Sequence, residues 1–120
     1  MRCLELLFGF ALAAAGGADP GGLVWSRTQT DLTGSAHDEI IEADFAFRNG
    51  GLKPVRITGL DSSCRCTTAA PGRWSYAPGD NGKIHVVFRV AGRTGHFDEL
   101  VEVQTDTAGN QELRLGVTTR

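Results

Sequence analysis

The chain has 120 residues, of which 12 are basic and 14 acidic, so its formal net charge at neutral pH is −2. With a charge balance this close to zero, nothing in the composition indicates a polybasic groove for nucleic acid or a polybasic membrane patch. Three cysteines are too few for a disulfide framework, so a hydrophobic core has to hold the fold. The length allows one domain with one modest core.

Residues 1–18 have the pattern of a secretory signal peptide. Arg2 is followed by the mostly apolar run of residues 4–15 and by small residues down to Ala18. A basic start, a short apolar stretch and an Ala/Gly-rich exit indicate export followed by cleavage. The apolar run has about 12 residues, whereas a membrane-spanning helix needs about 20, so we predict no membrane span. The alternative to a signal peptide is that these residues form a buried N-terminal helix. If the protein is exported, we expect it to be secreted or periplasmic.

Residues 19–38 form a predicted lead-in that is rich in Gly, Thr and Ser and carries one short strand around residues 23–27. From residue 39 the hydrophobic pattern has a period of two, which is typical of strands with one buried face. The predicted core includes Phe45, Val86 and Phe88. The predicted turns lie at 49–51, 78–82, 92–95 and 107–110.

This pattern gives about seven strands with turn residues between them and no helix of useful length. The predicted fold class is therefore all-β, an immunoglobulin-like antiparallel β-sandwich over residues 39–120.

Five motifs follow one another through the strand region: FAFRNGG, PVRITGLDSSCRCT, YAPGDNGKIHVVF, RTGHFDELVEVQTD and ELRLGV. In this order the chain resembles the bacterial domain-of-unknown-function family 1573 over nearly all of residues 40–117. The resemblance implies a secreted immunoglobulin-like domain with no established chemistry. Arg65 departs from the family, which usually has Gly in its Ser-Cys-Gly-Cys-Thr motif. If that Gly allows a positive φ, Arg65 costs about 1 kcal/mol there or adopts another conformation.

Cys64 and Cys66 are one residue apart, and three interpretations of them stay open. In an extended strand their Cα atoms are nearly 7 Å apart, so a disulfide requires a bend and closes a small, reducible ring. If the backbone is extended, the two thiolates lie on one face and suit Cu(I), whereas a structural zinc ion needs two further ligands. The third interpretation is that both sulfurs pack as small hydrophobic side chains. Cys64 and Cys66 are the candidate metal ligands, and copper is the alternative to having no cofactor.

The histidines available to complete such a site are His37, His85 and His96. They lie in the lead-in, on the outward face of a strand and after a turn, so the sequence does not predict that they converge on the cysteines. No Gly-x-Ser-x-Gly elbow, His-Glu-x-x-His helix or phosphate-binding Gly loop is present. We therefore predict no catalytic residues and no enzyme.

The predicted function is an exported, non-catalytic binding or assembly module. Its partner is expected to be another envelope or secreted protein, with no binding of nucleic acid. The alternative is a thiol-based periplasmic Cu(I)-binding or redox protein that uses Cys64 and Cys66.

Overall fold

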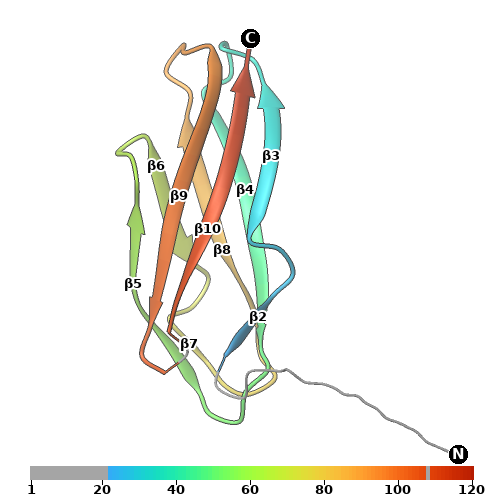
Figure 1. Cartoon of the computed structure of the whole chain (residues 1–120), viewed down its shortest axis with the longest axis vertical. Helices are drawn as coiled ribbons and strands as arrows, with labels where there is room; N and C mark the ends of the chain where they lie inside the picture. The colour runs from blue at the N-terminus through green and yellow to red at the C-terminus, as the bar shows by residue number, and fades with distance from the viewer. Residues whose placement is uncertain (1–21, 108) are drawn as a thin grey trace, which may run out of the picture.

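A computed structural model describes residues 22–107 and 109–120. The signal peptide predicted for residues 1–18 lies outside the described residues. Within them the protein is a β-sandwich of two sheets (Figure 1). Its nine strands are β2 (Leu23–Trp25), β3 (Gln29–Gly34), β4 (Ile40–Asn49), β5 (Val55–Ser62), β6 (Thr67–Pro71), β7 (Ser75–Tyr76), β8 (Asn81–Arg89), β9 (Gly95–Thr105) and β10 (Asn110–Thr119).

One sheet has the order β3-β10-β9-β5-β7 and the other the order β2-β4-β8-β6. All strand pairs are antiparallel except β3 and β10, which run parallel. The described strands outnumber the predicted seven, and β3 is a strand that the sequence did not predict. The all-β, immunoglobulin-like prediction is confirmed. No helix in the described part of the chain is long and apolar enough to cross a membrane.

The segment predicted as a lead-in contributes a strand to each sheet. β2 pairs with the end of β4, and the Ser26 amide then donates to the carbonyl of Ala46 at 2.9 Å. After residues 26–28 the chain reaches the other sheet, where the Arg114 amide donates to the Thr28 carbonyl at 2.8 Å and β3 begins. The sandwich therefore includes residues from Leu23 onward rather than beginning at residue 39.

The inward faces of the two sheets form a single apolar core. Phe45, Val86 and Phe88 are fully buried, which confirms them as core residues. Tyr76 joins this core from β7 and makes an edge-on contact with Phe47 at 4.8 Å between ring centroids. The strand periodicity read from the sequence therefore assigns the buried face correctly along β4 and β8.

Asn49 holds the turn after β4 through its side chain. Its Nδ2 donates to the carbonyls of Lys53 and Tyr76, both at 2.9 Å, and its Oδ1 accepts from the Gly51 amide at 3.0 Å. Asn49 itself is fully buried. Neither Gly50 nor Gly51 has a positive φ. The conformation of this turn is thus set by side-chain hydrogen bonds and not by glycine backbone freedom.

Candidate functional site

The Cys-x-Cys segment lies where the chain crosses from one sheet to the other. β5 ends at Ser62, and β6 begins in the opposite sheet at Thr67. Ser63 anchors the crossing to β9, because its amide donates to the Leu100 carbonyl at 2.9 Å and its Oγ accepts from the Leu100 amide at 3.0 Å. The Ser62 hydroxyl donates to the Thr67 carbonyl at 2.8 Å. Four residues, 63–66, are therefore clamped at both ends.

Cys64 and Cys66 are joined by a disulfide, one of the alternatives that the sequence left open. The segment is bent as that alternative requires: the Thr67 amide donates to the Cys64 carbonyl at 3.1 Å, and the two Cα atoms are 5.2 Å apart. Among the described non-glycine residues only Ala91 has a positive φ. Arg65 therefore does not enter the left-handed region.

This disulfide contributes little to the stability of the fold. Cross-links stabilise mainly by removing conformational freedom from the unfolded chain, and the effect grows with the closed loop. For a loop of three residues the same relation gives about 1.5 kcal/mol, about half of what it gives for a loop of 15 residues. The large core accounts for the stability of the fold better than this bridge does.

Glu99 brings a buried carboxylate to the disulfide from β9. The residue is only 7% exposed, and its Oε1 lies 3.8 Å from Cys66 Sγ. Two hydroxyls donate to the same oxygen, Thr67 Oγ1 at 3.1 Å and Ser63 Oγ at 3.4 Å. No basic side chain forms an ion pair with Glu99 within the described residues. A buried carboxylate is costly unless it is hydrogen-bonded, so the two hydroxyls stabilise it.

Glu99 is the site residue that the sequence interpretation missed. It lies two residues from Phe97 and from Val101 along β9 and shares their face, so the period-two pattern places it on the inward face. An acidic residue in phase with an apolar strand face was the available signal.

The ligand atoms of Cys64, Cys66 and Glu99 lie within 4.8 Å of one another. In the described part of the chain, none of the three histidines belongs to this group. In this structure the two sulfurs are bonded to each other. The prediction that Cys64 and Cys66 hold copper concerns their reduced thiols and stays a prediction.

His85 instead forms a cluster with two carboxylates on the outer face of the β2-β4-β8-β6 sheet. Its Nδ1 lies 2.6 Å from Asp44 Oδ1 and its Nε2 lies 2.8 Å from Glu42 Oε1. The hydrogen bond with Asp44 raises the pKa of His85, and the same bond lowers the pKa of Asp44. All three side chains are about half exposed, so water weakens these ion pairs. His96 contacts Thr118 and Asp98, and the amide of His37 lies in a turn with Ser35.

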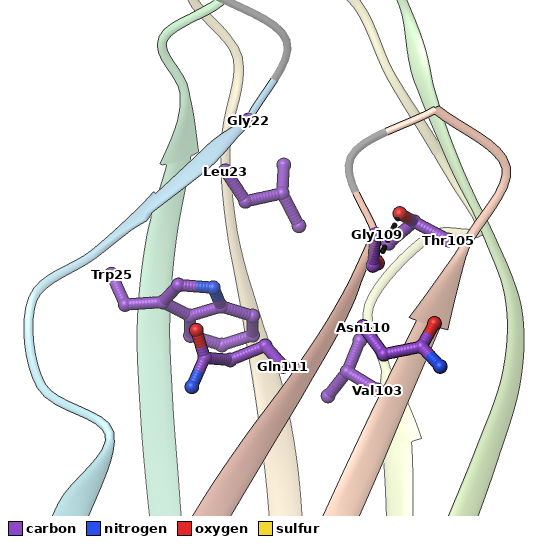
Figure 2. A pocket seen from close by; sticks show the side chains of 8 residues that line it. All are labelled: Gly22, Leu23, Trp25, Val103, Thr105, Gly109, Asn110 and Gln111. Atoms are coloured by element: carbon purple, nitrogen blue, oxygen red, sulfur yellow. Dashed lines mark hydrogen bonds between the residues drawn. The ribbon is translucent and has the colours of Figure 1, made fainter. Parts of the chain in front are cut away.

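A hollow of about 120 Å³ lies between β2 and the β9–β10 hairpin. Figure 2 shows Leu23 and Trp25 on one side and Val103, Thr105 and Asn110 on the other, and Gln111 of β10 also lines the hollow. Neither an acid nor a histidine lines it among the described residues. The Thr105 hydroxyl donates to the Gly109 carbonyl at 2.6 Å. This hollow therefore offers no set of groups for acid–base catalysis.

Comparison with known proteins supports a fold and a family. The model of a family described as "Protein of unknown function (DUF1573)" matches residues 23–119. No curated protein matches the chain.

Among solved structures, a protein of unknown function from Porphyromonas gingivalis W83 matches 90% of this chain with a TM-score of 0.68 and 15% identity. The chain spans 53% of the length of that protein. The ASH/PapD-like domain 7 of human CEP192 matches 84% of this chain and 87% of its own length, with a TM-score of 0.67 and 12% identity. The periplasmic chaperone SfaE matches 82% of this chain and 57% of its own length, with a TM-score of 0.61 and 10% identity. At these identities the likeness shows the fold alone.

Proposed function

The chain belongs to the DUF1573 family of proteins of unknown function, and from this premise we propose that it is an exported, non-catalytic module that binds an extended segment of another envelope or secreted protein. The segment adds as a strand to the open edge of β3. The observation that carries this proposal is the outward backbone along that edge, which pairs with no other described strand.

β3 is six residues long and pairs with β10 alone among the described strands. The carbonyls of Thr28 and Gly34 accept from the amides of Arg114 and Arg120, so the even-numbered residues face β10. Alternation along the strand then directs the backbone groups of three residues away from β10. These are Gln29, Asp31 and Thr33, all of which are exposed. Unpaired N–H and C=O groups in such a row form a template for another strand.

The β3 edge lacks two of the usual protections against strand addition. Its sequence, QTDLTG, contains no Pro and no Lys, and Asp31 is its one charged residue. The β6 edge differs, because Pro71 has no N–H to donate and the Thr67 backbone already bonds with Cys64 and Ser62. At the right of Figure 1, β3 lies at the edge of the five-stranded sheet, beside the C-terminal part of β10.

The fold is compatible with a binding role. SfaE is a periplasmic chaperone and the CEP192 domain is PapD-like, and both share this fold at low identity. The pattern of residues 1–18 supports export, and the described hollow carries no catalytic set of groups.

The test combines cross-linking with a backbone-specific variant. A photo-reactive residue replaces Thr33 in the full chain, and the cross-linked segment is identified after expression in the native host. A synthetic peptide of that segment is then titrated against wild type, Thr33→Pro and Thr33→Ala. Proline removes the outward N–H and is tolerated on an edge strand, whereas alanine removes only the side chain.

We expect Thr33→Ala to bind as wild type does and Thr33→Pro to bind at least about tenfold more weakly, because one inter-strand hydrogen bond is lost and the strand is blocked. Equal binding by all three proteins refutes the β3 edge. Self-association that Thr33→Pro abolishes would assign the edge to a second copy of this chain and overturn the proposed partner.

A further inference from the structure

We infer that the Cys64–Cys66 disulfide is redox-active and exchanges with a cysteine dithiol of a partner protein, with Cys64 as the sulfur that enters the mixed disulfide. The site consists of the disulfide, Glu99 and the two hydroxyls of Ser63 and Thr67. It uses no residue of the β3 edge.

The carboxylate of Glu99 fits the reduced form of this pair better than the oxidised form. In the disulfide, Cys66 Sγ has no proton, so the Glu99 Oε1 atom 3.8 Å away receives no hydrogen bond from it. After reduction the Cys66 thiol donates to that oxygen. Because Glu99 is buried, an added donor stabilises the protein, and the gain belongs to the reduced state alone.

The surroundings of the two sulfurs differ, and the difference decides which one exchanges. Cys66 packs against the hydrophobic core and faces Glu99. Cys64 is not part of that packing, and the Cys66 amide donates to its Sγ at 3.1 Å. A hydrogen bond from an amide favours negative charge on a sulfur, so in the reduced form Cys64 is the better attacking thiolate. In the disulfide, a partner thiolate attacks the sulfur that it can reach, and Cys66 is held between the core and Glu99. The neighbours Ser62, Ser63 and Arg65 are exposed, so a protein-sized partner can reach the loop.

The exchange is a two-step transfer of two electrons. A partner thiolate first attacks Cys64 Sγ: a partner–Cys64 bond forms, the Cys64–Cys66 bond breaks, and its electron pair goes to Cys66. Through solvent, Cys66 takes up the proton that the partner thiol released, and its S–H then donates to Glu99.

The second partner thiolate next attacks the partner sulfur of the mixed disulfide. The partner closes a disulfide of its own, and Cys64 leaves with the electron pair and gains the second proton. The partner dithiol has lost two electrons and two protons, and the two cysteines of this chain have gained them. The same steps in reverse reduce a disulfide of the partner.

The first experiment compares the two single-cysteine variants of the pair. Cys66→Ser retains the Cys64 thiol and Cys64→Ser retains the Cys66 thiol. Each is incubated with glutathione disulfide, and mass spectrometry follows the mixed disulfide after circular dichroism has confirmed that the variant is folded. We expect Cys64 to react at least tenfold faster than Cys66. Equal rates, or a faster reaction at Cys66, overturn the assignment of Cys64.

The second experiment leaves both cysteines in place and therefore does not depend on the folding of those variants. The intact protein is equilibrated with mixtures of reduced and oxidised dithiothreitol and then with a reduced synthetic peptide that carries two cysteines. Alkylation and mass spectrometry count the thiols. We expect reversible reduction of the folded protein by both dithiols, with disulfide formation in the peptide. A bridge that is reduced only after the protein unfolds refutes the exchange, and reduction by dithiothreitol without oxidation of the peptide refutes the protein substrate.

Glu99→Gln tests the carboxylate, and Glu102→Gln is the matched control on the outward face of the same strand. An amide oxygen is a weaker acceptor than a carboxylate, so we expect the equilibrium constant for reduction to fall about tenfold in Glu99→Gln, which is about 30 mV for a two-electron couple. Glu102→Gln is expected to match wild type. No change in Glu99→Gln, or the same change in both variants, overturns the role of Glu99. Thr33→Pro is expected to exchange as wild type does, so failure at the β3 edge and failure at the disulfide are distinguishable.

Discussion

Replacing Asn49 with alanine is expected to destabilise the protein by about 3–4 kcal/mol. The side chain makes three hydrogen bonds, with the Lys53 carbonyl, the Tyr76 carbonyl and the Gly51 amide. At about 1 kcal/mol net for each bond these contribute about 3 kcal/mol. The Tyr76 carbonyl also loses a partner in a buried place, and an unsatisfied buried group adds to the loss.

Equilibrium unfolding in urea, followed by circular dichroism, measures this loss as a fall in the midpoint at constant slope. Asn81→Ala is the matched control, because Asn81 is exposed at the start of β8 and should change the stability by no more than about 0.5 kcal/mol. Asn49→Asp is expected to cost at least as much as Asn49→Ala, since it turns a carboxylate oxygen toward two carbonyls. A loss below about 1 kcal/mol in Asn49→Ala would refute the role given to this side chain.

Three further predictions concern the stability and the metal chemistry. The hydrogen bond with Asp44 raises the pKa of His85, so its contribution to stability is complete below the unfolded pKa and is lost as the pH rises through the folded pKa. The free energy of unfolding should therefore fall as the pH rises above about 6.5, the ordinary pKa of His, and His85→Gln should flatten that slope while His37→Gln keeps it. The Arg93 guanidinium lies over the rings of Phe88 and Phe97, 5.1 and 4.8 Å from their centroids, and donates to the Val90 carbonyl at 3.0 Å. Arg93→Lys should therefore lower the urea midpoint by the equivalent of about 1–2 kcal/mol. An unchanged midpoint would contradict this packing. If the copper alternative holds, the oxidised protein takes up no Cu(I), the reduced protein about one equivalent and Cys64→Ser/Cys66→Ser none; uptake by the double variant would exclude the thiols as the ligands.

The sequence predicts the sandwich well because strand periodicity is a local signal. Phe45 and Phe88 lie on the buried faces that alternation assigns to them. The switch of β2 and β3 between the sheets has no such signal. It depends on backbone hydrogen bonds with β4 and β10, whose partners are far away in the sequence.

The candidate site was predictable only in part, for two physical reasons. Two cysteines at a spacing of two are compatible with an extended or a bent backbone, and the bend depends on contacts of Ser63 with Leu100 in a distant strand. The sequence shows that Glu99 is an acidic residue on an apolar strand face. Its contact with Cys66 depends on the position of β9 beside the crossing loop, which the sequence does not show.

Amide hydrogen exchange along β3, measured by NMR with and without the cross-linked partner peptide, tests the strand-addition proposal most directly. In the free protein the outward amides of Asp31 and Thr33 should exchange quickly, while those of Thr30 and Leu32, which face β10, should be protected. Binding of the peptide should slow Asp31 and Thr33 at least about tenfold, because each gains a hydrogen bond from a new strand. Protection that develops elsewhere and leaves Asp31 and Thr33 unchanged would contradict strand addition at this edge.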